Sequence, residues 1–186
     1  MKTPNSSTIE KAWLASSDAE YKDLKLQKGS VEKWEDGMRT TGESGTYEWW
    51  YFDGKLADGS TMVVGFYTKL LTNLQHGLEP VIMVNIDFED GSKVEKRVEY
   101  VKSDWSASTE QCDVTIAGNY FRGDLEKYEI HFQDDELTLD IQIARETMSW
   151  RPETGHMMFG SEGDFFAWVV AVPQGEATVT YTYQGK

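Results

Sequence analysis

The stretch Tyr47-Glu48-Trp49-Trp50-Tyr51-Phe52-Asp53-Gly54 decides the fold, because five of its first six residues are aromatic. Aromatic residues suit the half-buried surface of a strand, and successive side chains of a strand point to opposite faces. Alternation therefore gives two faces, one with Glu48, Trp50 and Phe52 and the other with Trp49, Tyr51 and Asp53. Because both faces carry large rings, we expect one face to pack a core and the other to meet a ligand or further protein.

Turn residues on either side of short apolar runs predict antiparallel hairpins. Asp58-Gly59 separates residues 47–56 from 61–71, and Asp90-Gly91 separates 81–88 from 93–101. Both dipeptides tolerate the positive φ angles of tight hairpin turns. A third hairpin is predicted for residues 127–132 and 137–144 around residues 133–136, and period-two alternation predicts one shared face for Leu137, Leu139, Ile141 and Ile143.

Two further segments extend the β pattern towards the end of the chain. Residues 114–117 and 118–123 read as a strand pair around a glycine-marked bend. Residues 165–172 and 177–183 predict a fourth hairpin around Pro173-Gln174-Gly175, and the continuously apolar first arm predicts burial on both faces. The fold class expected is all-β, an antiparallel lipocalin-like barrel or strongly curved sheet of about 8–10 strands.

The first forty residues lack this pattern. Ser7 and Glu10 have the spacing of a capping box, and Trp13 and Leu14 follow at helical spacing from Ile9, which predicts one short helix. Residues 16–46 are polar and glycine-containing, which is typical of irregular structure or short edge strands around a sheet. We therefore expect an N-terminal wrap over residues 1–43 and a β-domain over residues 44–186.

Composition excludes several classes of partner. The 32 acidic and 18 basic residues give a formal charge of −14, which repels nucleic acid and anionic lipid. The chain has no apolar run of about eighteen residues, so no membrane span is expected. The polar segment Met1 to Ser7 is unlike a signal peptide, and Cys112 is the only cysteine, so the sequence favours a cytoplasmic, reducing location.

Sequence motifs exclude the common catalytic classes. His76, His131 and His156 are scattered, without the spacing of a metal site, and no metal is expected. The chain contains no Gly-x-Ser-x-Gly, no phosphate-binding loop and no dinucleotide fingerprint. Hydrolase, NTPase and Rossmann functions are therefore not indicated, and no cofactor is expected.

Aromatic residues make up 13% of the chain, and they either line a pocket for an apolar or conjugated molecule or fill a barrel interior. Glu48 and Asp53 are catalytic candidates, because a carboxyl group desolvated beside aromatic rings keeps its proton and can act as an acid. One interpretation assigns Tyr67, His76 and Glu79 to the same site, because Tyr67 lies on the partner strand and residues 72–80 form the loop that follows it. The ligand-binding candidates are Trp49, Trp50, Tyr51, Tyr67, His76 and Trp168. The structural alternative is a solvated strand-end carboxylate, a core tyrosine and a polar loop.

The segment 47–54, followed by Leu56 and Asp58-Gly59, resembles the opening motif of the carotenoid 1,2-hydratase (hydroxyneurosporene synthase) and AttH-like family. The resemblance covers the chain from about residue 43 to its end. It continues through residues 118–123, 137–140, 155–160 and 166–170, with Pro173 and Gly175. It implies a lipocalin-like domain that binds a bulky, unsaturated molecule such as a polyene or terpenoid, with Trp49, Trp50 and Tyr51 in the family's aromatic signature.

The resemblance also implies a division of labour, in which ligand binding and catalysis depend on two different domains. Members of the family look like two lipocalin-like domains in tandem, and the second normally begins with a Tyr-His-Asp-His-Asn-Trp-Gly-like segment that this chain lacks. We therefore expect this chain to be the first of two such domains, part of a hydro-lyase or cyclase, which binds but turns over little alone. The alternatives are a stand-alone carrier or sensor of lipid-like molecules and a structural or interaction module.

Overall fold

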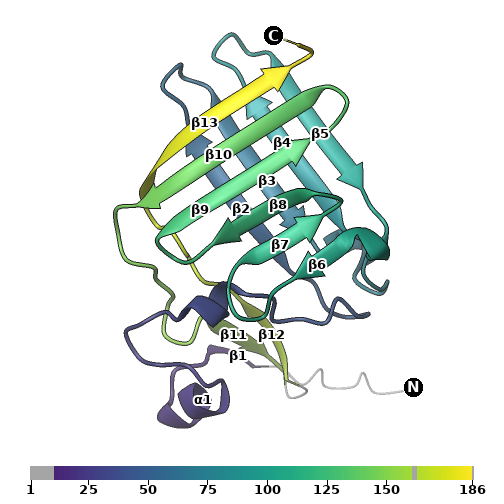
Figure 1. Cartoon of the computed structure of the whole chain (residues 1–186). Helices are drawn as coiled ribbons and strands as arrows, with labels where there is room; N and C mark the ends of the chain where they lie inside the picture. Colours follow the sequence, from purple (N-terminus) through teal and green to yellow (C-terminus); the bar gives the residue numbers. More distant parts are fainter. Residues whose placement is uncertain (1–10, 161–162, 186) are drawn as a thin grey trace, which may run out of the picture. The chain divides into compact units, whose positions relative to one another are not determined.

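The computed structural model describes residues 11–160 and 163–185 (Figure 1). The chain divides into two compact units. The smaller one, called here the small unit, takes in Met1–Val31 and Met148–Pro173, and the larger one, the sandwich unit, takes in Glu32–Thr147 and Gln174–Lys186. Residues 11–31 of the expected wrap thus belong to the small unit, and residues 32–43 belong to the sandwich unit.

A four-stranded antiparallel sheet contains the first two predicted hairpins. Its order is β2-β3-β4-β5, formed by β2 (Trp49–Lys55), β3 (Thr61–Tyr67), β4 (Val81–Asp87) and β5 (Lys93–Glu99). Gly59 and Gly91 have φ angles of +87° and +85°, which residues with a Cβ rarely adopt. Both Asp-Gly turns are therefore confirmed.

A six-stranded antiparallel sheet forms the other layer of the sandwich unit. Its order is β13-β10-β9-β8-β7-β6, formed by β6 (Trp105–Ala107), β7 (Asp113–Ile116), β8 (Asn119–Gly123), β9 (Lys127–Gln133), β10 (Leu137–Arg145) and β13 (Gly175–Tyr183). The β9–β10 hairpin and the β7–β8 pair confirm two further predictions. Figure 1 shows this sheet in front of the four-stranded one, with the strands of the two layers crossing.

The core of the sandwich unit consists of the side chains that the two sheets turn towards each other. Alternation along β2 buries Trp50 and Phe52 and leaves Tyr51 half exposed, as predicted. Phe66 of β3 and Phe121 of β8 meet edge-to-face with ring centroids 5.9 Å apart. The predicted inward set of β10 is confirmed by the burial of Leu137, Leu139, Ile141 and Ile143.

The fourth predicted hairpin is wrong. Strand β12 (Asp164–Ala167) pairs with β11 (His156–Phe159), whereas β13 pairs with β10 over nine residues, from Leu137↔Tyr183 to Arg145↔Gly175. Pro173-Gln174-Gly175 therefore leads from the small unit into the sandwich unit instead of closing a hairpin. The expected burial of residues 165–172 on both faces is also wrong, because Phe165 and Trp168 are exposed.

The small unit contains a three-stranded antiparallel sheet and one helix. The sheet order is β1-β11-β12, with β1 at Ala12–Leu14, and α1 spans Asp18–Asp23. A capping box does start the helix, but it is formed by Ser17 and Glu20. The predicted cap at Ser7 and Glu10 lies outside the described residues, while Trp13 and Leu14 belong to a strand and not to a helix.

The antiparallel all-β fold class is confirmed. Of the two forms predicted, the strands take the open one, since the hydrogen bonds of the described residues connect thirteen strands into three separate sheets and not into a closed barrel. Short helical turns η1 (Lys33–Asp36), η2 (Leu71–Asn73) and η3 (Lys102–Asp104) complete the sandwich unit. Within residues 11–160 and 163–185, no helix has the length and apolar character needed to cross a membrane.

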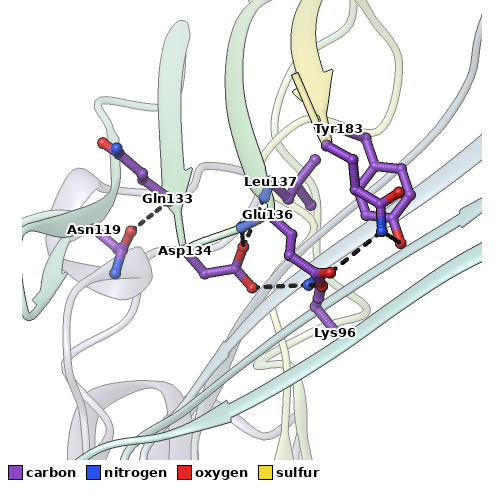
Figure 2. A network of polar contacts seen from close by, with 8 residues as sticks. Lys96, Asn119, Gln133, Asp134, Glu136, Leu137 and Tyr183 are labelled. Atoms are coloured by element: carbon purple, nitrogen blue, oxygen red, sulfur yellow. Dashed lines mark hydrogen bonds and ion pairs between the residues drawn. The ribbon is translucent and has the colours of Figure 1, made fainter. Parts of the chain in front are cut away.

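One cation joins the two layers at the β9–β10 turn. Figure 2 shows the carboxylates of Asp134 and Glu136 turned towards Lys96 of β5, which is 3.2 Å from Asp134 and forms a second ion pair with Glu136. Asp134 also accepts hydrogen bonds from the backbone N–H groups of Glu136 (2.8 Å) and Leu137 (2.7 Å). The side chain of Lys96 is only 13% exposed, so this network is screened less by water than an ordinary surface pair.

Candidate ligand-binding face

The outer face of the four-stranded sheet carries a cluster of aromatic side chains, called here the aromatic shelf and formed by Tyr47, Trp49, Tyr51 and Tyr67. The Tyr47 ring lies 5.0 Å from that of Trp49 and 6.4 Å from that of Tyr67. Burial raises the pKa of Tyr47 to about 12, with the nearby Tyr67 hydroxyl adding to the effect. Burial also raises the pKa of Tyr51 and Tyr67, so these hydroxyls remain protonated hydrogen-bond donors at neutral pH.

A glycine allows one ring of the shelf to lie flat on the sheet. Gly65 of β3 stands between Tyr51 of β2 and Met83 of β4 in the pairing register. A Cβ atom at Gly65 would lie 2.5 Å from atoms of the Tyr67 ring, which is closer than van der Waals contact permits. The absence of a side chain at this position therefore creates the space that the ring occupies.

An open hollow of about 320 Å³ lies in the same region of the sheet. It is lined by Leu70, Asn73, Glu79, Val81, Glu99 and Tyr100. Trp49, Tyr67, Val81 and Glu99 are paired in succession across β2, β3, β4 and β5. One row of the sheet therefore runs from the aromatic shelf into the hollow.

The loop between β3 and β4 places His76 beside this hollow. Its Nδ1 lies 3.0 Å from Glu79, and Glu79 also accepts a hydrogen bond from the side-chain amide of Asn73 at 2.9 Å. These two donors lower the pKa of Glu79, so it is a carboxylate at neutral pH. Buried Lys69 holds the loop in place by donating to the backbone oxygens of Glu43 (2.7 Å) and His76 (2.6 Å).

Glu48, a catalytic candidate, points away from the shelf and holds a loop. Its carboxylate accepts hydrogen bonds from the backbone N–H groups of Arg39 and Thr40, both at 2.9 Å, and from the Thr40 hydroxyl at 2.8 Å. Burial raises its pKa, and these hydrogen bonds oppose that increase. A carboxylate with three donors is an anchor for residues 39–40, and its oxygens are already occupied.

The other candidates are distributed over both units. Asp53 lies on the exposed outer face of β2, where its carboxylate interacts with the Tyr51 hydroxyl. Trp50 lies in the core, and its indole N–H donates to the backbone oxygen of Asp36 at 2.9 Å. Trp168 belongs to the small unit. The predicted set thus comes together only in part, with Trp49, Tyr51, Tyr67 and His76 on one side of one sheet.

A second polar cluster was not predicted from the sequence. Asp36, at the end of η1, accepts a hydrogen bond from the Tyr128 hydroxyl of β9 and interacts with the thiol of Cys112. Asp36 lies in the acidic run Glu32-Lys33-Trp34-Glu35-Asp36, which has the composition of a solvated segment. The only signal was Trp34, an isolated aromatic residue in that run, which indicates that this segment contacts the fold.

No family model, no curated protein and no solved structure matches this chain. The resemblance to the hydratase family therefore depends on the motif residues quoted above. Among the residues that the structure describes, no group of three or more His, Cys, Asp or Glu side chains is arranged to hold a metal ion.

Proposed function

We propose that this chain is a lipocalin-like domain that binds a bulky, apolar, unsaturated molecule, such as a polyene or terpenoid, on the outer face of its four-stranded sheet. The observation that carries the proposal is the row Trp49, Tyr67, Val81 and Glu99, which connects the aromatic shelf to the hollow. A flat conjugated molecule gains dispersion and stacking contacts on such rings. Its polar end would meet Asn73 and Glu79 in the hollow.

Binding without turnover fits the surroundings of two carboxyl groups, those of Glu48 and Glu79. Protonation of a double bond needs an acid whose proton points at the substrate, and the carboxylate of Glu48 is instead occupied by Arg39 and Thr40. Glu79 is a carboxylate at neutral pH and has no proton to give. We therefore assign any hydratase or cyclase chemistry to a second, lipocalin-like domain, and this chain supplies an aromatic wall. In a stand-alone carrier or sensor the same face would bind the ligand without a partner.

The test is a titration with all-trans-retinol, a fluorescent conjugated polyene, followed by quenching of protein fluorescence. We expect Tyr51→Ser and Tyr67→Ser to weaken binding by about tenfold or more, because each removes a stacking ring. Tyr120→Ser is the matched control, since Tyr120 is a partly exposed tyrosine on the other sheet, where its ring stacks on His131. Equal loss in the control, or no loss in the two shelf variants, would contradict the proposal, and hydration of a polyene by this chain alone would contradict the division of labour.

An observation in the small unit favours a second function, which is association with a further lipocalin-like domain. Residues between 148 and 168 expose large apolar side chains, namely Met148, Trp150, Met157, Phe159, Phe165, Phe166 and Trp168. Aromatic residues and methionine are enriched in the centres of protein interfaces. If the natural reading frame continues past Lys186 into such a domain, hydrogen exchange of β11 and β12 should slow when that domain is present, and unchanged exchange would reject the association.

A further inference from the structure

Asp36, at the end of η1, is half-buried, and its carboxyl group faces side chains of the sandwich unit. Asp36 accepts a hydrogen bond from the Tyr128 hydroxyl and interacts with the Cys112 thiol. Its backbone oxygen accepts the indole N–H of Trp50 at 2.9 Å. The surroundings of Asp36 therefore include side chains from three elements, which are Trp50 of β2, Tyr128 of β9 and Cys112 of the loop before β7.

The charges around Asp36 disfavour its ionised form. Burial is the main cause that raises the pKa of Asp36 to about 7, the Glu48 carboxylate adds to it, and the hydrogen bond from Tyr128 opposes it. The positive charge of Arg39 acts on Glu48, and Asp113 adds a negative charge beside Cys112. On its solvent side, η1 forms an exposed ion pair between Lys33 and Asp124 at 3.3 Å. Lys33 is thus paired with another carboxylate, whereas the Arg39 guanidinium donates to the backbone oxygens of Gly37 and Thr109 and lies 4.9 Å from the centroid of the Trp34 ring of η1.

The chain after η1 is fixed, which confines any movement to the helical turn. The backbone N–H of Met38 donates to Ser108 at 2.7 Å, and Thr40 donates twice to Glu48. At Gly37 the backbone runs so close to Thr109 that a Cβ atom would lie 2.8 Å from its carbonyl group. Residues 37–40 therefore form a fixed base from which η1 can lift.

We propose that η1 is a proton-controlled latch, which stays closed over Cys112 and Tyr128 while the Asp36 carboxyl carries its proton and lifts when that proton is lost. A carboxylate at this place would be desolvated beside the Glu48 carboxylate, and these two effects outweigh the hydrogen bonds from Tyr128 and Cys112 that favour the ionised form. Lifting η1 returns that charge to water and exposes the end of the core at Trp50 and Tyr128. The latch goes beyond ligand binding and does not depend on it.

Cys112 reports the state of the latch directly, because it is the only cysteine and is 1% exposed. The experiment measures modification of the full chain by an uncharged maleimide across neutral pH, each rate divided by that of the urea-unfolded chain at the same pH. The division removes the effect of thiol ionisation. Between about pH 5.5 and about pH 8.5 we expect the normalised rate to rise by roughly tenfold or more, with a midpoint near the pKa of the acid.

Three variants separate the latch from general loosening. Asp36→Asn keeps a neutral group of the same size, so its normalised rate should stay flat across this pH range. Glu48→Gln removes the neighbouring negative charge and should move the midpoint to lower pH, whereas Tyr128→Phe removes a hydrogen-bond donor to the carboxylate and should move it to higher pH. Circular dichroism verifies that each variant is folded.

A flat profile in the wild-type chain would overturn the proposal, and so would a rise in Asp36→Asn that matches the wild type. If Asp36→Asn does not fold, the midpoints of Glu48→Gln and Tyr128→Phe decide the question. Opposite shifts in the expected directions support the latch, and an unchanged midpoint in both variants overturns it.

Discussion

Strands β10 and β12 are both rich in apolar residues, yet they meet water very differently. In β10 of the sandwich unit every second residue is apolar, and Leu137, Leu139 and Ile141 are almost fully buried. In β12 of the small unit consecutive Phe165 and Phe166 are both exposed to a large degree. The difference teaches that alternation of apolar and polar residues specifies which face of a strand is buried. A continuous apolar run specifies neither the partner strand nor whether other elements bury its faces.

The comparison is tested most strongly by removing a large side chain from the core of the sandwich unit. Phe66 is fully buried and packs edge-to-face on Phe121. Phe66→Ala should lower the free energy of unfolding by about 3–5 kcal/mol, because it leaves a cavity between the sheets. Urea unfolding followed by circular dichroism measures the change. A loss below about 1 kcal/mol would mean that this core is loosely packed.

The free energy of unfolding of the sandwich unit should depend on pH, because burial raises the pKa of Asp36 to about 7. An acid whose pKa is raised by folding stabilises the fold at low pH, and that stabilisation is lost as pH rises from about 4 to about 7. Relative to Asp36→Asn, the wild type should lose on the order of 2–4 kcal/mol between these pH values. Urea unfolding of both proteins at the two pH values measures it, and parallel pH profiles would contradict it.

A smaller effect is expected from the ion network that joins the two layers (Figure 2). Lys96→Met keeps the length of the side chain and removes the charge near Asp134 and Glu136, which should cost about 1–2 kcal/mol of stability. Lys93→Met is the matched control on the same strand, because Lys93 forms an exposed pair with Asp87. It should unfold at the same urea concentration as the wild type. Equal destabilisation by both changes would show that the enclosed position of Lys96 is unimportant.

Most of the sandwich unit could be predicted from the sequence, because its signals are local. Asp58-Gly59 and Asp90-Gly91 fix turns, and alternation along β10 fixes a face. The pairing of β13 with β10 could not be predicted in this way, because residues 148–173 of the small unit separate the two strands in the sequence. In addition, Pro173-Gln174-Gly175 looks like a hairpin turn. Pairing between distant segments leaves no local pattern.

The candidate site could be predicted only in part, for a similar reason. Trp49 and Tyr51 were found because alternation assigns them to one face, and Tyr67 was found because it lies on the predicted partner strand. Asp36 was missed, because its burial depends on Tyr128, which lies far away in the sequence. Glu48 was found as a residue with a raised pKa, but its hydrogen bonds to residues 39–40 could not be read from a strand pattern.

The smallest effect is expected in the small unit, where Phe165→Ala is the counterpart of Phe66→Ala. Phe165 is 57% exposed, and its ring lies beside that of His156, with centroids 5.1 Å apart. The change should lower the free energy of unfolding by less than about 1 kcal/mol, because it opens no closed cavity and removes one ring contact. The same urea experiment as for Phe66 measures it. If the two changes destabilise equally, Phe165 is buried in solution, and the contrast between the two apolar strands does not hold.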